Sequence, residues 1–432
     1  MKIIIVGDGK VGYALTEQLS RENHDIVVIE RDAKALQKAI NVFDVMGIQG
    51  NGASREVQEE AGVDSADVLI AATSADELNI LCCLVAKKLG AEHTIARVRN
   101  PEYLEQLRWM KKDLGLSMTV NPEYEAAQEI FRTLRTPGAI KIDSFAKGRV
   151  ELAEVRITED SKLDSLKLSE LRQRYKQKIL VCAVSREKKV IIPNGEFTLR
   201  EGDKIHITAP PDEMSAFFKK IGVLKQRVHS VMLIGGGRIS YYLAKMLLDI
   251  GMHVTIIEIN PARCAELNAL LPEANIVNGD GSEQEVLREE GINEIDAFIA
   301  LTNLDEENMI MSMYAKDHEV PKIIVKINRR SFHNIMIKAG VDSIVSPKML
   351  TTYEIVRYIR AMQNSVGDNM ESLYKILEGR AEALEFNIFE DSDITDVPLK
   401  RLSLKQNLII AAIVREGRII MPTGESCIRL GD

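Results

Sequence analysis

The sequence predicts an α/β fold with two Rossmann-like, doubly wound parallel-sheet domains, each followed by a small α+β lobe. Three observations predict it. Most of the 432-residue chain repeats itself after 228 or 229 residues. Within each copy, short β-branched runs alternate with helical patterns, as expected for parallel strands covered by helices on both faces. Each copy also opens with a strand, a glycine turn and a helix, which is how a Rossmann unit begins.

The repeat rests on motifs at matching positions. MKIIIVGDGKVG at the N-terminus matches SVMLIGGGRIS from Ser230, so Gly7 pairs with Gly235, 228 residues later. AATSADELN matches ALTNLDEEN, and PNGEFTLREGD matches PTGESCIRLGD, both with a spacing of 229. Solenoid repeats have periods of about 20–50 residues, so this repeat is a duplicated pair of domains.

Each Rossmann copy contains a series of short apolar runs that predict strands. In the first copy they are Ile3–Val6, Asp25–Ile29, Val68–Ala72 and Thr94–Val98, and in the second Val231–Ile234, Val254–Ile257, Ala297–Leu301 and Ile323–Ile327. The helix after the first glycine turn is expected to bury Val11, Leu15 and Leu19.

The pattern changes after each Rossmann unit. NPEYEAAQEIFRTLRT from Asn121 and SPKMLTTYEIVRYIRAM from Ser346 begin with a polar residue and a proline, which predicts the start of an amphipathic helix. Such a helix either packs into a core of its own chain or links domains in a ring, and the sequence leaves both open. Alternating strands follow in GRVELAEVRIT, KILVCAVSR, KVIIPNG and DKIHITA, which predict a small β-rich lobe.

The predicted division of the chain follows from these changes of pattern. It consists of Rossmann domain 1 (1–121), a crossover helix region (122–143), lobe 1 (144–227), Rossmann domain 2 (228–346), a second crossover region (347–371) and lobe 2 (372–432). Gly222–Val228 is a candidate hinge. Lobe 2 stops at Gly431-Asp432 without a counterpart of the strand Lys204–Thr208, so either the sequence is cut short or this lobe is incomplete.

Composition limits the function classes. A net charge of −8 argues against a nucleic-acid partner, because binding to nucleic acid needs a basic face. The five cysteines form no CxxC pair or Cys/His cluster, so we expect no metal site and no disulfide framework. The N-terminus does not resemble a signal peptide, and no apolar run is long enough for a membrane span. These features indicate a soluble, cytoplasmic protein.

The first glycine turn predicts a nucleotide site. Gly7-Asp8-Gly9-Lys10-Val11-Gly12 follows a strand and opens a helix, the context that a GxGxxG motif requires. Its glycines allow a tight turn, close approach of a pyrophosphate and close helix packing, and the helix N-terminus attracts phosphate. Glu30 ends the second strand, where a carboxylate accepts hydrogen bonds from ribose. It favours NAD or ATP over NADP, although the neighbouring Arg31 weakens this preference. The alternative is a plain glycine turn with an exposed acid.

Further polar residues follow the strands, at the edge where an open α/β sheet binds its ligand. In the first copy they are Asn51, Gly52, Thr73, Ser74, Asp76, Asn79, Arg97 and Arg99. Thr73 and Ser74 alternatively cap the next helix. The two arginines either reach terminal phosphates or form surface salt bridges.

The second copy carries a similar set with one departure. Gly235, Gly237, Arg238 and Ile239 keep the turn, but Ser240 replaces the third glycine. Glu258 is retained at the ribose position. The matching strand-end residues are Asp280, Gly281, Thr302, Asn303 and Lys326. We therefore expect a second nucleotide site, with a degenerate copy kept for its shape as the alternative.

The chain resembles the TrkA family of potassium-uptake proteins, which are built from tandem RCK (KTN) nucleotide-binding domains, each with a TrkA-C lobe. The matching stretches are VGDGKVG, VIERD, GNGAS and AATSADELN with their second-copy counterparts, together with PNGEFTLREGD, and the resemblance covers nearly the whole chain. Ser240 and the missing last strand depart from the family pattern.

The resemblance implies a peripheral cytosolic regulator of a Trk-type potassium channel or transporter. Such a protein binds NAD(H) and adenine nucleotides, assembles into a tetrameric ring and has no catalytic residues. Glu30, Arg97 and Arg99 match the positions at which these domains hold ribose and phosphates. The implied partners are the transporter's membrane subunit, at the inner face of the cell membrane, and further copies of this chain.

Three other functions are alternatives to a regulator. An NAD-dependent dehydrogenase needs an acid or base beside the nicotinamide, but the lobes are short and the seven histidines do not recur between the copies. A scaffold with a structural nucleotide stays possible. A redox-sensing transcription factor would need a helix-turn-helix or a basic segment, and the sequence has neither.

Overall fold

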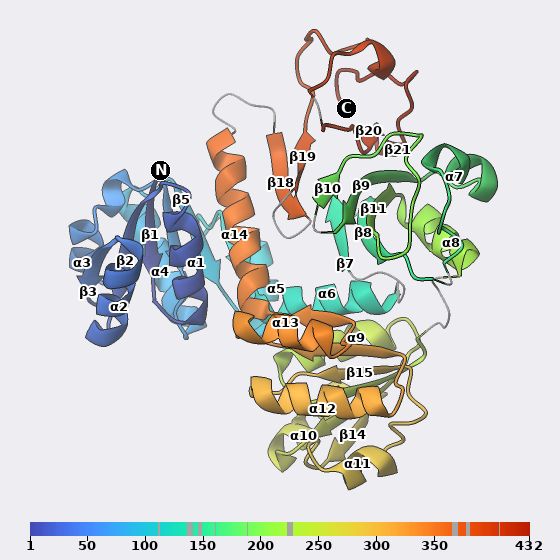
Figure 1. Cartoon of the computed structure of the whole chain (residues 1–432). Helices are drawn as coiled ribbons and strands as arrows, with labels where there is room; N and C mark the ends of the chain where they lie inside the picture. The colour runs from blue at the N-terminus through green and yellow to red at the C-terminus, as the bar shows by residue number, and fades with distance from the viewer. Residues whose placement is uncertain are drawn as a thin grey trace. The chain divides into compact units, whose positions relative to one another are not determined.

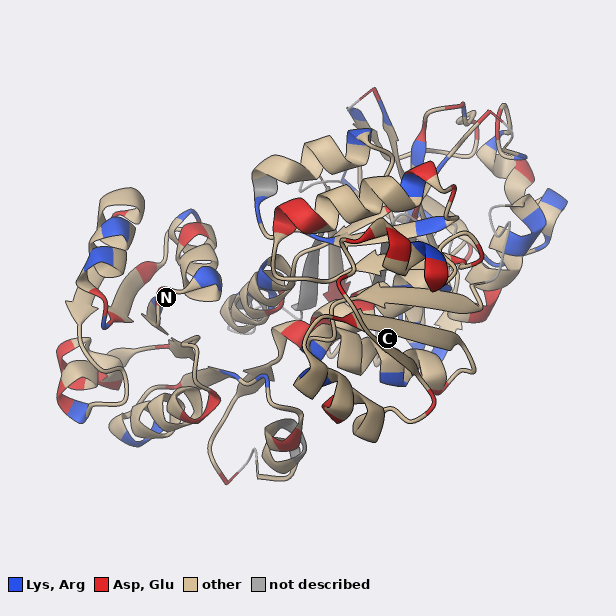
Figure 2. Ribbon diagram, turned by 90° about the horizontal axis from the view of Figure 1, so that it is seen from below, with Lys and Arg blue, Asp and Glu red and all other residues tan. Residues whose placement is uncertain are grey.

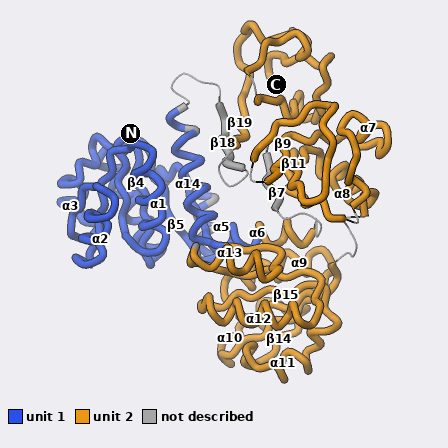
Figure 3. The backbone as a smooth tube through the Cα atoms, in the orientation of Figure 1, with its two compact units in different colours: residues 1–128, 346–363 blue, residues 129–345, 364–432 orange. Residues whose placement is uncertain are grey.

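The computed structural model describes residues 1–110, 113–135, 141–145, 149–159, 161–187, 189–222, 228–364, 370–376, 381–405 and 407–432 (Figure 1). Most of the predicted hinge Gly222–Val228 lies outside these residues. The chain forms two compact units, one of residues 1–128 and 346–363 and the other of residues 129–345 and 364–432 (Figure 3). This partition is coarser than the six predicted segments, whose boundaries stay a prediction.

The first unit is built on a six-stranded parallel sheet with the order β3-β2-β1-β4-β5-β6. The sheet and its helices are β1 (Lys2–Val6), α1 (Lys10–Ser20), β2 (Asp25–Glu30), α2 (Ala33–Phe43), β3 (Met46–Gln49), α3 (Arg55–Glu60), β4 (Val68–Ala71), α4 (Asp76–Leu89), β5 (His93–Arg97), α5 (Pro101–Met110) and β6 (Met118–Val120). The chain order reverses beside β1, so the carboxyl ends of β1 and β4 border a crevice at which such sheets bind ligands.

Burial explains why the central strands read as continuous apolar runs. Ile3, Ile4 and Ile5 of β1 are all fully buried, because helices cover both faces of the sheet. Side chains of α1 and α2 pack on one face, and side chains of α3, α4 and α5 pack on the other. The predicted inner face of α1, formed by Val11, Leu15 and Leu19, is buried as expected.

The second copy repeats this architecture in its own parallel sheet, of order β14-β13-β12-β15-β16-β17. Its elements are β12 (Ser230–Ile234), α9 (Arg238–Leu248), β13 (His253–Glu258), α10 (Pro261–Leu270), β14 (Asn275–Asn278), α11 (Gln284–Glu289), β15 (Ala297–Ala300), α12 (Asp305–Asp317), β16 (Lys322–Lys326), α13 (Arg330–Lys338) and β17 (Ser343–Val345). The predicted fold class, with two doubly wound parallel sheets, is confirmed.

Lobe 1 is a five-stranded antiparallel sheet of order β10-β9-β11-β8-β7. It consists of β7 (Lys141–Phe145), β8 (Val150–Arg156), α7 (Leu168–Tyr175), β9 (Leu180–Arg186), β10 (Lys189–Ile191), β11 (Lys204–Ala209) and α8 (Pro211–Ile221). Phe217 and Phe218 of α8 are fully buried in its core against β8, β9 and β11. The four strands read from the sequence are present, whereas β7 and both helices were not predicted.

Lobe 2 contains two separate strand pairs in the part that the structure describes. β18 (Met370–Ile376) pairs with β19 (Ala381–Phe386), and β20 (Ile413–Arg415) pairs with β21 (Arg418–Ile420), each pair antiparallel. The Arg415 guanidinium holds the Asp432 carboxylate with nitrogen–oxygen distances of 2.7 Å, as Arg186 holds Asp203 in lobe 1. The PTGESCIRLGD stretch therefore folds like its counterpart in the first lobe.

The two crossover helices are α6 (Pro122–Arg135) and α14 (Pro347–Asn364). Although α14 follows the second Rossmann copy, it belongs to the first unit (Figure 3). Its Ile355, Val356 and Ile359 are buried among Ile3 and Ile5 of β1 and other apolar side chains of that sheet face. Arg360 also binds Glu22, with 2.9 Å between Nε and Oε2. For α14, the core-packing alternative is correct.

Replacing Ile359 with alanine should destabilise the first unit. The side chain is fully buried, and removing such a group costs about 2–5 kcal/mol of the free energy of unfolding. Thermal unfolding should shift down by several degrees. Ile337→Ala on α13 is the matched control, because that side chain is 57% exposed. Equal melting temperatures for the two variants would contradict the packing described for α14.

Lys and Arg positions and Asp and Glu positions are interspersed along the ribbon in the view of Figure 2. No helix among the described residues is long and apolar enough to cross a membrane.

Candidate functional site

A pocket of about 400 Å³ lies at the carboxyl ends of β1, β2 and β4, where the chain order of the first sheet reverses. Its volume is in the range of small-molecule sites. Ten of the predicted residues line it, namely Gly7, Gly9, Lys10, Val11, Glu30, Arg31, Gly52, Thr73, Ser74 and Arg97. The other five lining residues were not predicted and are Val6, Ile29, Gly50, Ala72 and Leu78. Most of these are apolar positions at strand ends, which a search for polar groups overlooks.

The first glycine turn shapes one wall of the pocket. Gly7 has a φ of +92°, a backbone conformation that favours glycine. No atom lies within 4 Å of the position that a Cβ on Gly9 would occupy. Gly12 lies so close to the turn that a Cβ would overlap the carbonyl oxygen of Gly7. No side chain of the described residues caps the N-terminus of α1, and its first turn has no acidic residue. Its backbone N–H groups and helix dipole are therefore available to a phosphate.

Glu30 is held at the end of β2 by backbone donors. Its Oε2 accepts a hydrogen bond from Asp8 N at 2.6 Å, and its Oε1 accepts from Arg31 N at 2.7 Å and Asp32 N at 3.0 Å. Because these bonds fix the carboxylate at the edge of the pocket, it can accept further hydrogen bonds from ligand hydroxyls.

Asp8, behind this carboxylate, does not line the pocket. Its side chain is nine-tenths buried, and burial together with the charge of Glu30 raises the pKa of Asp8 to about 6.

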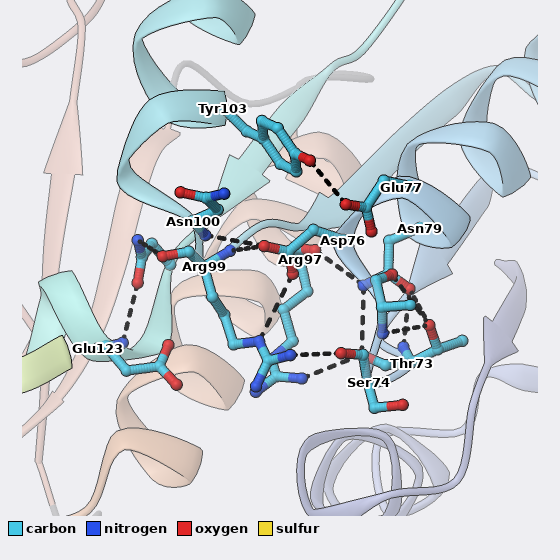
Figure 4. Close-up of polar contacts among 12 residues, drawn as sticks. Thr73, Ser74, Asp76, Glu77, Asn79, Arg97, Arg99, Asn100, Tyr103 and Glu123 are labelled. Atoms are coloured by element: carbon cyan, nitrogen blue, oxygen red, sulfur yellow. Dashed lines mark hydrogen bonds and ion pairs between the residues drawn. The ribbon is translucent and has the colours of Figure 1, made fainter. Parts of the chain in front are cut away.

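Thr73, Ser74 and Arg97 line the pocket as well, with Thr73 directly beside Gly7. Arg97 Nη1 donates to the carbonyl oxygen of Thr73 at 3.0 Å, which places the guanidinium beside the β4–α4 loop (Figure 4). The capping alternative does not describe Thr73, because Ala75 is the N-cap of α4 and no side chain caps it. The Thr73 hydroxyl instead donates to Asn79 Oδ1 at 2.7 Å.

Asp76 and Asn79 are committed to backbone groups rather than to the pocket. Asp76 Oδ2 accepts from Arg99 N and Asn100 N, both at 2.8 Å. Asn79 accepts from Thr73 N at 2.8 Å and donates to the carbonyl oxygen of Arg97 at 2.8 Å. Both side chains are buried and fix the loops that carry Thr73 and Arg97. A direct contact of either with ligand stays a prediction.

Arg99 connects the pocket wall to the first crossover helix. Its guanidinium binds the carbonyl oxygen of Ser74 and lies 3.5 Å from Asp76 Oδ1 (Figure 4). Its own carbonyl oxygen accepts from Asn121 Nδ2 at 3.3 Å. Asn121 Oδ1 in turn accepts from Glu123 N and Tyr124 N at 3.0 Å, at the first turn of α6. The salt-bridge alternative thus describes one contact of Arg99.

The remaining residues of the first site lie in the loop after β3. Gly52 has no room for a Cβ, because Val6 packs against it. Asn51 is exposed, and its Oδ1 accepts from Ala53 N at 3.3 Å. The loop therefore brings its backbone close to the end of β1, beside the glycine turn.

The second copy reproduces the turn and its carboxylate. Gly235 has a φ of +93°, Gly237 faces open space, and no side chain of the described residues caps α9, which starts with Arg238 and the buried Ile239. Glu258 accepts from Gly236 N at 2.6 Å and from Asn260 N at 2.8 Å. Ser240 is fully buried, and its hydroxyl donates to the carbonyl oxygen of Gly235. Serine is therefore accommodated at the third glycine position.

The strand-end residues of the second copy are used differently from those of the first. Lys326 is buried, and its Nζ lies 3.0 Å from Asn303 Oδ1. Asp280 Oδ1 accepts from Ser282 N at 2.9 Å, and the adjacent Gly281 packs against Ile234. Thr302 is bound by Asn308 in the same way as Thr73 by Asn79, with a Thr302 Oγ1 to Asn308 Oδ1 distance of 2.7 Å. The two copies therefore share the Thr–Asn pair after the fourth strand of the copy, but in the second copy the Lys326 ammonium group is already bound by the side-chain amide of Asn303.

The arrangement can bind an anionic ligand with hydroxyl groups, since an uncapped helix N-terminus, cations and a fixed carboxylate line the same pocket. Among the described residues, no group of three His, Cys, Asp or Glu side chains is placed to hold a metal ion.

The chain is similar to known proteins over its whole length. Residues 3–122 and 231–347 match the TrkA-N domain, and residues 152–222 match the TrkA-C domain. A Trk system potassium uptake protein TrkA homolog of Archaeoglobus fulgidus is 34% identical, over 100% of this chain and 96% of the relative. A TrkA homolog of Methanosarcina mazei is 32% identical with the same coverage, and TrkA of Azorhizobium caulinodans is 28% identical over 100% and 94%.

Solved structures share the fold at lower identity. The GsuK channel superposes with a TM-score of 0.68 at 19% identity, over 100% of this chain and 75% of that one. The GsuK channel bound to NAD gives 0.66 at 19% identity with the same coverage. GsuK bound to ADP gives 0.51 at 16% identity, over 84% and 69%.

Proposed function

Because the chain belongs to the TrkA family of tandem TrkA-N and TrkA-C proteins, we propose that it is the nucleotide-sensing subunit of a Trk-type potassium uptake system. It is an RCK regulatory protein and not an enzyme, so the dehydrogenase alternative is set aside. The observation that carries the proposal is the pocket at the first glycine turn, which is lined by both Glu30 and the uncapped N-terminus of α1.

The proposed ligands are NAD(H), ATP and ADP. Each combines phosphates, suited to the N-terminus of α1, with ribose hydroxyls, suited to Glu30. The GsuK structures, which share this fold, hold NAD or ADP. We assign ribose to Glu30 and the phosphates to the turn Gly7–Gly12 and Arg97, with Glu258 and Arg238 in the corresponding roles in the second copy.

The signal would pass from the pocket to the rest of the chain through α6. This helix begins in the first unit and ends in the second, where Ile130 and Leu134 are buried. Its first turn is held by Asn121, which is bound to the carbonyl oxygen of Arg99. A phosphate that draws the Arg99 guanidinium away from Ser74 would shift Arg99 and with it the hydrogen bond between its carbonyl oxygen and Asn121 at the start of α6. Nucleotides that engage Arg99 unequally would then favour different conformations of α6.

The proposed setting is the cytoplasmic face of the membrane. The partners would be the membrane subunit of the potassium transporter and further copies of this chain in a ring. The rotation or splaying of that ring would act on the pore mechanically. A nucleotide with a purely structural role is the competing outcome that the experiment below distinguishes.

The test is a binding panel with nucleotide-free protein. NAD⁺, NADH, ATP and ADP should each raise the melting temperature, since a ligand at 100 times its Kd stabilises by about 2.7 kcal/mol. At least two of them should give different small-angle scattering profiles and different rubidium flux into vesicles containing a Trk-type membrane subunit. Binding without any difference in shape or flux would leave a structural nucleotide, and no binding would refute the proposal.

A further inference from the structure

The two Rossmann copies differ at the second position of the glycine turn. The first has Asp8 there and the second has Gly236. The Asp8 side chain is 9% exposed, and its Oδ1 has no hydrogen-bond partner among the described residues. A buried carboxylate oxygen without a partner is costly when the group is charged. Its presence behind a ligand pocket therefore needs a functional explanation.

The space for Asp8 is provided by the facing helix. A Cβ on Gly236 would lie 2.6 Å from Cδ1 of Leu267 on α10, so a side chain there would require Leu267 to move. The residue 228 positions before Leu267 is Ala39 on α2, which is small and buried. The pairs Asp8 with Ala39 and Gly236 with Leu267 are thus complementary in size.

The second copy supports its turn with a cation instead. Arg263 Nε donates to the carbonyl oxygen of Gly236 at 2.7 Å, and its guanidinium pairs with Glu266 at 2.7 Å. The equivalent residues in the first copy are Ala35 and Lys38. The first copy therefore has a buried acid at the place where the second has an arginine on the backbone.

The charged groups that face Asp8 are Glu30 at the end of β2 and Lys38 on α2. Glu30 is bonded directly to Asp8, because its Oε2 accepts a hydrogen bond from the backbone N–H of Asp8 at 2.6 Å. Lys38 lies over the ring of Tyr13 on α1, with Nζ 4.9 Å from the ring centre. The same turn carries Lys10, which lines the pocket. Burial and Glu30 raise the pKa of Asp8 to about 6, with Lys38 opposing them.

A nucleotide in the pocket would act on Asp8 in one direction. Its phosphates add negative charge at the turn, and the bound ligand excludes water. Both effects disfavour a charged Asp8, so the pKa of Asp8 is higher in the complex than in the free protein. Ligand then binds more tightly to the protonated form, and affinity falls as pH rises above about 6.

We propose that Asp8 links nucleotide binding in the first Rossmann unit to proton uptake, so that this site, unlike the second, binds more tightly as the cytoplasm acidifies. This inference rests on the proposed function, because it assigns a regulatory input to the same pocket. The ligand class is a nucleotide whose phosphates do not titrate near neutrality.

The test is calorimetry with NAD⁺, whose pyrophosphate keeps a constant charge between pH 6 and 8. Terminal phosphates titrate near pH 6 and would obscure the effect. Glu258→Ala isolates the first site and Glu30→Ala the second. In the Glu258→Ala protein, affinity should fall at least five-fold from pH 6 to pH 8. The heat of binding should vary with the ionisation enthalpy of the buffer, because protons are taken up.

Adding Asp8→Asn to the Glu258→Ala protein should make the NAD⁺ affinity of the first site independent of pH. The NAD⁺ affinity of the second site, measured in the Glu30→Ala protein, should be independent of pH without any change at Asp8. A pH dependence that survives Asp8→Asn would overturn the inference, and so would pH-independent binding in the presence of Asp8. An absence of NAD⁺ binding at every pH would refute the proposed function and this inference with it.

A second measurement does not depend on ligand. Since folding raises the pKa of Asp8 from 3.8 to about 6, the stability that its protonated form contributes is fully present only below about pH 4 and is lost as pH rises from there to about 6. Asp8→Asn should therefore melt above the wild-type protein at pH 8 and approach it at pH 4. A constant difference between the two proteins would overturn the inference even if the variant bound no nucleotide.

Discussion

Replacing Gly12 with serine is expected to disable the first nucleotide site. A Cβ at this position would overlap the carbonyl oxygen of Gly7, so the turn or the N-terminus of α1 must move. Overpacking of this kind costs about 1–3 kcal/mol of stability. Displacement of the helix N–H groups should also lower NAD⁺ affinity at least ten-fold, which corresponds to about 1.4 kcal/mol. Thermal melting and calorimetry in the Glu258→Ala background measure the two effects.

The second copy provides the matched control. Ser240 occupies the equivalent position, is fully buried and donates its hydroxyl to the carbonyl oxygen of Gly235. Because this copy already accommodates a Cβ, Ser240→Gly should change stability and affinity much less than Gly12→Ser. Nearly wild-type binding by Gly12→Ser would show that close packing of α1 on the turn is not required.

The sheets were predictable because their central strands are simple. Ile3–Val6 and Val231–Ile234 are continuous apolar runs followed by glycine, a combination with few other interpretations. The short edge strands β3 (Met46–Gln49) and β6 (Met118–Val120) were not predicted. Edge strands are partly exposed, so their sequences lack the continuous apolar character that identifies a buried strand.

The position of α14 could not be predicted from the sequence, for a different reason. An amphipathic pattern shows that one face of a helix is buried, but it does not identify the surface that covers it. Ile355, Val356 and Ile359 could have packed on the sheet of their own copy. They pack instead on the sheet of the first copy, more than 200 residues earlier in the chain.

Polar residues at strand ends were harder to interpret than the glycines. Thr73 and Asn79 both follow β4, and the sequence predicts both as ligand-binding groups. In the structure Thr73 lines the pocket, whereas Asn79 is buried and holds backbone atoms of Thr73 and Arg97. Residue type and spacing cannot separate a side chain that faces a ligand from one that positions the loop beside it.

Glu30→Ala is expected to have the largest effect on ligand choice. A hydrogen bond to a charged group contributes about 1.5–3 kcal/mol, so loss of the ribose contact should weaken NAD⁺ binding about 10- to 100-fold. Part of this loss would be structural, because the carboxylate also accepts from Asp8 N, Arg31 N and Asp32 N. Affinity alone therefore does not identify the role of Glu30.

The comparison of NAD⁺ with NADP⁺ separates the two contributions. A carboxylate that binds ribose repels a 2′-phosphate. In the Glu258→Ala background, which isolates the first site, the protein with Glu30 should therefore prefer NAD⁺ over NADP⁺, and adding Glu30→Ala should reduce this preference, with Arg31 left beside the site. Distortion of the turn would lower the affinities for NAD⁺ and NADP⁺ equally and leave the ratio of the two affinities unchanged. Glu258→Ala, measured by the same titrations in the Glu30→Ala background, tests the second copy. A preserved NAD⁺ preference in Glu30→Ala would mean that the ribose lies elsewhere in the pocket and that Glu30 only supports the glycine turn.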